Sequence, residues 1–100
     1  MQPLNMTWVA AGKRYCTVTA TLIAHDAYWN GHSWEQDGRN TFLFRTPNGN
    51  FFAQYQTLLP VETGKIVPLE IDEAVSLYHS LYKKEVPFAV AFPSVKVKDA

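Results

Sequence analysis

The amino-acid sequence predicts one α+β domain, in which a curved antiparallel sheet of about five strands packs against one C-terminal amphipathic helix. Up to residue 69, short segments rich in Thr, Val, Phe and Tyr alternate with turn-forming residues, which is typical of strands. Beyond that point apolar residues recur every three or four positions, which indicates a helix. The chain has 100 residues, 47% of them hydrophobic, which is enough for one domain with its own core.

We expect this domain to span residues 1–100, with mobile ends at 1–5 and 95–100. Nine basic and nine acidic side chains cancel, which disfavours nucleic acid and anionic membranes as partners. The sequence shows neither a signal peptide nor an apolar stretch of the ~20 residues that a membrane span needs. The single cysteine, Cys16, excludes an internal disulfide and fits a buried strand position better than a reactive thiol. These features predict a cytoplasmic protein.

The N-terminal region predicts a hairpin followed by a third strand. Strands are expected at residues 6–10 and 13–16, with a turn at Ala11 and Gly12 between them. The segment 17–24 contains three threonines and several branched apolar residues, so its second half predicts another strand. A local turn at residues 17–19 separates that strand from the one before.

Residues 25–40 differ from their surroundings because polar and turn-forming side chains dominate there. A connection of about sixteen residues is long for a compact domain, and such loops are either functional or packed down by their own side chains. Three large aromatic residues, Tyr28, Trp29 and Trp34, lie in it. They form either a small satellite core that pins the loop or a surface that contacts a partner, since Trp and Tyr are frequent at interface hot spots.

The stretch Thr41–Thr57 predicts the central hairpin of the sheet. Its two flanks are rich in Phe, Tyr and Thr, and Pro47, Asn48 and Gly49 lie between them. A two-residue loop at Asn48 and Gly49 would need a hydrogen bond from the N–H that Pro47 lacks. We therefore predict a three-residue loop, in which Pro47 and Asn48 form the centre of a type I turn and Gly49 adopts the left-handed conformation.

The C-terminal part predicts a last strand and the helix. The strand spans Lys65–Leu69 and either ends at Pro68 or lies along an edge, because proline donates no ladder hydrogen bond. The helix is predicted from Ile71 to about Glu85, with an apolar face of Ile71, Ala74, Val75, Leu77, Tyr78, Leu81 and Tyr82. Acidic residues lie in its first turn and Lys83 and Lys84 in its last, where the helix dipole favours each sign. Pro87 ends the helix, and the apolar segment 86–93 packs back on the core.

Several of these segments together resemble an uncharacterised family of small bacterial and archaeal proteins. The pattern consists of Gly12-Lys13-Arg14-Tyr15 with the threonines behind it, then Arg39–Leu43, Arg45-Thr46, Gly49–Phe52, Pro68-Leu69, Glu73-Ala74 and Phe92-Pro93. The resemblance covers most of the chain from Gly12 onwards, and it implies no activity, cofactor or catalytic residue. One position departs from the pattern: Glu70 stands where a Ser or Thr cap is expected, and this weaker cap costs about 1 kcal/mol.

The residues form no constellation that we can match to a metal site or to catalysis. Cys16 has no recognisable base beside it, and the five glycines form no nucleotide-binding fingerprint. Zinc needs three or four ligands with a supporting shell, and the spacing of the available donors fits no ligand motif. Those donors are His25, Asp26, His32, Glu35 and Asp37. We therefore expect neither a bound metal nor a cofactor, and a hydrolase-like enzyme is the third hypothesis.

Nucleic-acid binding is the second hypothesis, because an arginine and several aromatic residues share the central hairpin. Exposed aromatic rings on a sheet stack bases while nearby cations hold phosphates. We expect the helix to cover one face of the hairpin and to bury most of its aromatic side chains. The cations left as candidates for the outer face are Lys13, Arg14, Arg39 and Arg45.

The leading hypothesis is a small, non-catalytic interaction module that binds an unknown protein partner or a second copy of itself. Its contact surface is expected at a sheet edge or in the long loop between residues 28 and 34. The candidate surface residues are Tyr28, Trp29, His32, Trp34, Arg39 and Arg45.

Overall fold

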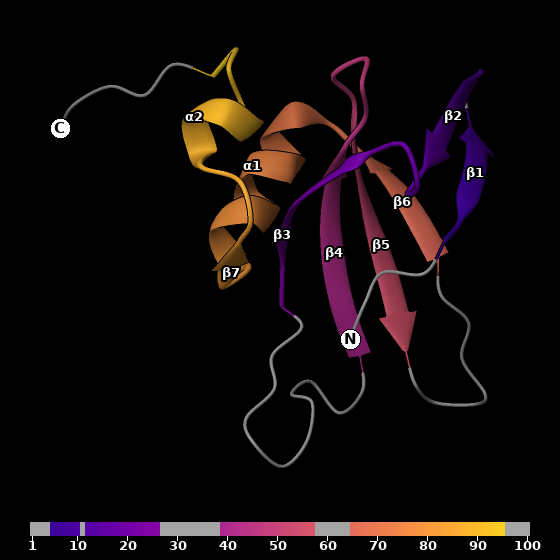
Figure 1. Ribbon diagram of the computed structural model, residues 1–100, viewed down its shortest axis with the longest axis horizontal. Helices are drawn as coiled ribbons and strands as arrows, with labels where there is room; N and C mark the ends of the chain where they lie inside the picture. Colours follow the sequence, from indigo (N-terminus) through magenta and orange to yellow (C-terminus); the bar gives the residue numbers. More distant parts are fainter. Residues whose placement is uncertain (1–4, 11, 27–38, 58–64, 96–100) are drawn as a thin grey trace, which may run out of the picture.

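The computed structural model describes residues 5–10, 12–26, 39–57 and 65–95, with the backbone alone at 39, 56 and 57. Within these ranges the chain forms a five-stranded antiparallel sheet, a separate two-stranded sheet and short helices, which confirms the α+β class (Figure 1). The elements are β1 (Thr7–Ala10), β2 (Lys13–Cys16), β3 (Thr21–His25), β4 (Arg39–Arg45), β5 (Phe51–Thr57), β6 (Lys65–Leu69), α1 (Ile71–Ser80), β7 (Lys83–Lys84) and α2 (Phe88–Ala91). The helices lie at one side of the large sheet, and the pair β1–β2 lies at the other (Figure 1).

The strands β4 and β5 form the centre of the large sheet, whose strand order is β6-β5-β4-β3-β7. The loop between them has the predicted three-residue form. The N–H of Gly49 donates to the carbonyl of Thr46 (2.9 Å), and the N–H of Thr46 donates to the carbonyl of Asn50 (2.7 Å). Gly49 has a φ of 84°, in the left-handed region where a Cβ is costly. The predicted edge position of β6 is confirmed as well.

Alternate residues of β4 and β5 enter two different cores, one on each face of the sheet. On the helix side, Leu43 and Phe51 pack with Tyr78 of α1 and with Phe92, which follows α2. The ring centroids of Phe51 and Phe92 lie 4.9 Å apart, and those of Tyr78 and Phe92 lie 5.5 Å apart. The C-terminal segment therefore returns to the core, as predicted.

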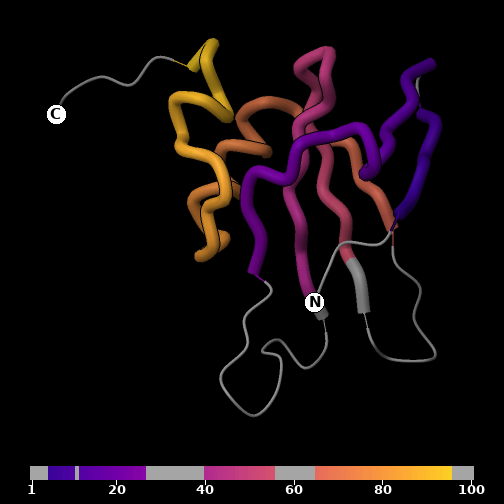
Figure 2. The backbone as a smooth tube through the Cα atoms, in the orientation of Figure 1, coloured from indigo at the N-terminus to yellow at the C-terminus, as the bar shows by residue number. Residues whose placement is uncertain are grey.

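The prediction that the helix buries most of the hairpin's aromatic side chains is wrong. Phe42, Phe44 and Phe52 lie on the opposite face, in a core that also contains Ile66 and Tyr15 of β2. Alternation places the three phenylalanines there together, since Phe44 and Phe52 are cross-strand partners. The chain between β2 and β3 passes across this face (Figure 2), and Ala20 of this segment packs against the core.

Strand β3 is irregular, and the irregularity lets it serve both cores. Its register with β4 shifts between Leu22 and Ala24, which marks a bulge at Ile23. As a result Ile23 and Ala24 both enter the helix-side core, whereas Leu22 packs against the opposite core.

Helix α1 ends at Ser80, earlier than predicted, and Lys83 and Lys84 are not helical. Leu81 has an extended backbone (φ −87°, ψ 129°), and the two lysines then pair with β3 as the short edge strand β7. This pairing supplies partners for backbone groups along the edge of β3, which a longer helix would leave open. Pro87 is the N-cap of a second short helix, α2, so the described residues form two short helices.

The predicted apolar face of the helix is confirmed at Ala74, Tyr78 and Leu81, whereas Ile71 and Tyr82 are exposed. At the start of α1, the carboxylate of Glu73 accepts a hydrogen bond from the N–H of Glu70 (2.9 Å) and so supplies part of the cap. Neither helix in the described part of the chain is long and apolar enough to cross a membrane.

Replacing Gly49 by Ala is expected to lower the free energy of unfolding by about 1–2 kcal/mol, because a left-handed backbone strains a residue with a Cβ. The added methyl group itself has room, since its nearest neighbour is an Arg45 nitrogen at 3.8 Å. Urea unfolding measures the effect. The exposed Asn48 in the same turn provides the control, and Asn48→Ala should change stability by less than about 0.5 kcal/mol. Equal stabilities for the two variants would contradict the assigned turn.

Candidate interaction surface on the N-terminal hairpin

The structure describes two of the six residues predicted to form a contact surface. Arg39 and Arg45 lie at opposite ends of the seven-residue strand β4, so the fold does not bring them together. Arg45 is half-buried on the helix side of the sheet, beside the turn at Gly49. The other four, Tyr28, Trp29, His32 and Trp34, lie outside the described residues. The two alternatives for this loop, a satellite core or a contact surface, therefore stay predictions.

The described donors of the hypothetical metal site have other partners. His25 Nε2 lies 2.9 Å from Glu85 Oε1, and this contact ties β3 to the segment after β7. Asp26 Oδ1 accepts a hydrogen bond from the N–H of Thr41 (2.7 Å). Within the described ranges no three His, Cys, Asp or Glu side chains gather in a way that could hold a metal ion. The remaining donors, His32, Glu35 and Asp37, lie outside those ranges.

The N-terminal hairpin covers the large sheet with Tyr15 of β2 and with Met6 and Ala10, whereas the rest of β1 is exposed. Tyr15 of β2 is buried, and its ring lies 5.7 Å from that of Phe52 in an edge-on contact. In β1, by contrast, 51% of Trp8 and 66% of Val9 remain exposed. Figure 1 shows β1 as the outermost strand on the side away from the helices. The hairpin thus buries one face of the large sheet and also presents an exposed strand, β1, at the surface.

One hydrogen bond fixes which backbone groups of β1 face β2. The N–H of Thr17 donates to the carbonyl of Met6 (3.0 Å), just before β1 begins. In an antiparallel ladder, hydrogen-bonded pairs alternate with non-hydrogen-bonded pairs. Trp8 therefore bonds to β2, whereas the N–H and C=O groups of Thr7 and Val9 point away from it. Among the described strands only β2 pairs with β1, so these outward groups form an open edge.

Strand β1 also differs in composition from the other described strands that have an open edge. Natural sheets protect such edges with charged side chains, proline or very short strands. Protection of this kind is present in Lys65 and Pro68 of β6, in Lys83 and Lys84 of β7, and in Lys13 and Arg14 of β2. The sequence of β1, Thr-Trp-Val-Ala, contains neither a charge nor a proline.

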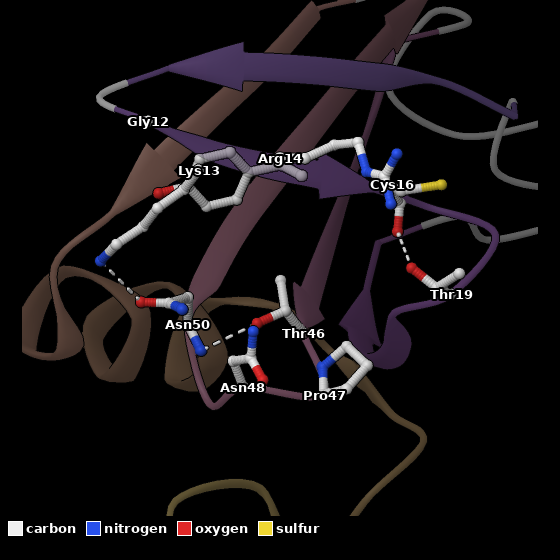
Figure 3. A pocket seen from close by; sticks show the side chains of 10 residues that line it. Gly12, Lys13, Arg14, Cys16, Thr19, Thr46, Pro47, Asn48 and Asn50 are labelled. Atoms are coloured by element: carbon white, nitrogen blue, oxygen red, sulfur yellow. Dashed lines mark hydrogen bonds between the residues drawn. The ribbon is translucent and has the colours of Figure 1, made fainter.

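On the other side of the hairpin, β2 and the β4–β5 turn enclose a hollow of about 390 Å³ (Figure 3). Strand β2 contributes Lys13, Arg14 and Cys16, and the turn contributes Asn48 and Asn50. Lys13 Nζ donates a hydrogen bond to Asn50 Oδ1 (3.2 Å), which joins the hairpin to the turn.

Cys16 differs from the inert, buried residue that the sequence predicts. Its side chain is only half-buried, and its pKa is lowered from the ordinary value of 9.0 to about 7. A hydrogen bond with the hydroxyl of Thr7 is the largest cause, and backbone groups of Thr19 and Val18 add to it. Hydrogen bonds to the thiolate favour the charged form and so lower the pKa. Thr7 can act in this way because it is the cross-strand partner of Cys16.

Comparisons of the chain with protein-family models, with curated proteins and with solved structures found no match. The resemblance to an uncharacterised family therefore stays a prediction.

The alkylation rate of Cys16 by iodoacetamide is expected to rise with pH around a midpoint of about 7, because the thiolate is the nucleophile. Thr7→Val removes the hydroxyl that contributes most to the low pKa, so it should raise the pKa and slow the reaction severalfold at neutral pH. Mass spectrometry measures the rates. Thr21→Val, at an exposed position of β3, should react like the wild type. An identical pH profile for Thr7→Val would show that Thr7 does not tune the thiol.

Proposed function

We propose that this protein is a small, non-catalytic interaction module that associates with a second copy of itself through the edge of β1. One observation carries the proposal: the backbone groups of Thr7 and Val9 point outward from an exposed strand that has neither charge nor proline. Open strand edges of this kind pair with another strand, because pairing satisfies their N–H and C=O groups. A second copy supplies a strand of the same composition and length.

The direction of the outward groups sets the register of the proposed dimer. Two copies of β1 pair antiparallel about a two-fold axis, as in most closed dimers. Thr7 of one copy then forms a hydrogen-bonded pair with Val9 of the other, and the two Trp8 residues form the non-hydrogen-bonded pair between them. In such a pair the Cα atoms lie about 4.5 Å apart and the side chains approach closely. Each Trp8, half exposed in the single chain, is covered by the other.

The proposed interface is small, because β1 has four residues. Interfaces of this size belong to weak or transient complexes. We therefore expect a dissociation constant on the order of 100 µM. A dimer of this affinity forms only at high protein concentration.

The competing nucleic-acid hypothesis has less support from the described residues. Base stacking needs exposed aromatic rings. Four of the five rings that the hairpin offers for this purpose are buried, namely Phe42, Phe44, Phe51 and Phe52. The fifth, Tyr55, is half-buried, and Lys65 Nζ lies 5.8 Å from the centre of its ring. A hydrolase-like activity lacks a nucleophile–base pair in the hollow, where Cys16 has no His, Asp or Glu among the described lining residues.

Light scattering tests the proposed dimer. The average mass should rise from that of one 11.4 kDa chain towards twice that value as the concentration increases from about 10 to about 500 µM. Val9→Pro should stay monomeric over this range, because proline removes an outward N–H without breaking a bond to β2. Trp8→Lys should also stay monomeric, since it places two like charges opposite each other.

Val90→Lys is the matched control, because the exposed fraction of Val90 (61%) is close to that of Val9 (66%) but Val90 lies on α2, at the other side of the sheet. This variant should dimerise like the wild type. Circular dichroism establishes that each variant is folded. A wild type that stays monomeric at the highest concentration, or folded Val9→Pro and Trp8→Lys variants that still dimerise, would refute the proposal.

A further inference from the structure

The hollow between β2 and the β4–β5 turn lies apart from the β1 edge, and its lining is positively charged. Lys13 and Arg14 line it, and none of its described lining residues is Asp or Glu. In a chain whose charges cancel overall, this is a local concentration of positive charge. We infer that the hollow binds the phosphate group of a small molecule, a function separate from self-association.

The two cations are not neutralised by other side chains in the described structure. Neither Lys13 nor Arg14 forms an ion pair with a carboxylate there. The Lys13 ammonium donates to Asn50 Oδ1, which is a neutral acceptor. Both charges are available to an anion from solution.

Lys13 and Arg14 are neighbours in β2, so their exposed side chains leave the strand on opposite faces and reach the hollow from different sides. Figure 3 shows Lys13 reaching down to the turn at Asn50, whereas Arg14 extends along β2 towards Cys16. The charges thus flank the hollow on two sides. A guanidinium can donate two parallel hydrogen bonds to phosphate oxygens, and an ammonium adds a compact point charge.

Uncharged donors complete the lining. Asn48 and Asn50 carry amide N–H groups, and Thr19 carries a hydroxyl. The positions of the two asparagines are fixed by the turn, in which the N–H of Asn50 donates to Thr46 Oγ1 (3.0 Å). Phosphate presents several acceptor oxygens, so it can use cations and neutral donors at once.

The size of the hollow favours a small phosphate compound over a nucleic acid. Its volume of about 390 Å³ is near the lower end for small-molecule sites. Binding a nucleic-acid strand needs a longer run of cations and exposed rings for stacking. The aromatic ring in the lining, that of Tyr15, is buried against the core.

Titrations followed by NMR of the backbone amides test the inference with three probes: inorganic phosphate, phosphoserine and a ten-residue oligothymidylate. Inorganic phosphate and phosphoserine should cause saturable shifts in residues 12–16 and 46–50. Arg14→Gln and Lys13→Gln should each weaken binding about tenfold, because each removes a charge-assisted contact. Lys83→Gln, which removes an exposed cation from β7, is the control and should bind like the wild type.

The probes also separate the possible sources of the phosphate group. Tighter binding of phosphoserine identifies a phosphate monoester, and equal binding identifies free phosphate; both outcomes support the site. Oligothymidylate binding that is tighter than that of phosphoserine and equally sensitive to Arg14→Gln would reassign the hollow to nucleic acid and overturn the inference. An absence of saturable shifts, or equal weakening by Lys83→Gln, would also overturn it.

Discussion

The burial of both faces of the central β4–β5 hairpin is the constraint on which the rest of the structure depends. Phe44 and Phe52 stack on one face with ring centroids 5.0 Å apart, and Leu43 and Phe51 are buried on the other. Burial of each large apolar side chain stabilises the folded state by about 1.5–3 kcal/mol. A chain of this length must therefore supply two covers, and it uses its C-terminal helices for one face and its N-terminal hairpin for the other.

The N-terminal hairpin acquires its surface features from this covering role. Because β1 and β2 pack on a face of the large sheet, they do not continue its ladder and remain a separate pair of strands. The outer strand of that pair keeps an open edge, and the inner strand forms a hollow where it passes the β4–β5 turn. The proposed dimer edge and the proposed phosphate site are thus two consequences of one packing arrangement.

Turn chemistry and helical spacing predict the features of the fold that depend on residues close together in the sequence. The missing N–H of Pro47 and the backbone freedom of Gly49 determine the three-residue loop, and helical spacing identifies Tyr78 as a core residue. Helical spacing does not predict the end of α1, because β7 forms only when the edge of β3 lies beside it and that contact is distant in the sequence. The position of the N-terminal hairpin was missed for the same reason, since its core contacts are distant in sequence.

In the candidate site, too, contacts within the hairpin can be predicted from the sequence, whereas contacts made by tertiary packing cannot. The pairing of Ala10 with Lys13 places Thr7 opposite Cys16, so the predicted hairpin contains the contact that lowers the pKa of the thiol. Lys13 and Arg14 were among the candidate cations, but their convergence with the β4–β5 turn depends on tertiary packing. Of the predicted surface residues, Arg39 and Arg45 are separated by the length of a strand.

Hydrogen exchange of single amides in β1, measured at several protein concentrations, distinguishes an edge that pairs with a second copy from one that stays unpaired. The amides of Thr7 and Val9 point away from β2, whereas that of Trp8 bonds to it. Self-association through this edge predicts that protection of Thr7 and Val9 increases with concentration while protection of Trp8 is present throughout. Protection of Thr7 and Val9 that is independent of concentration would contradict the account.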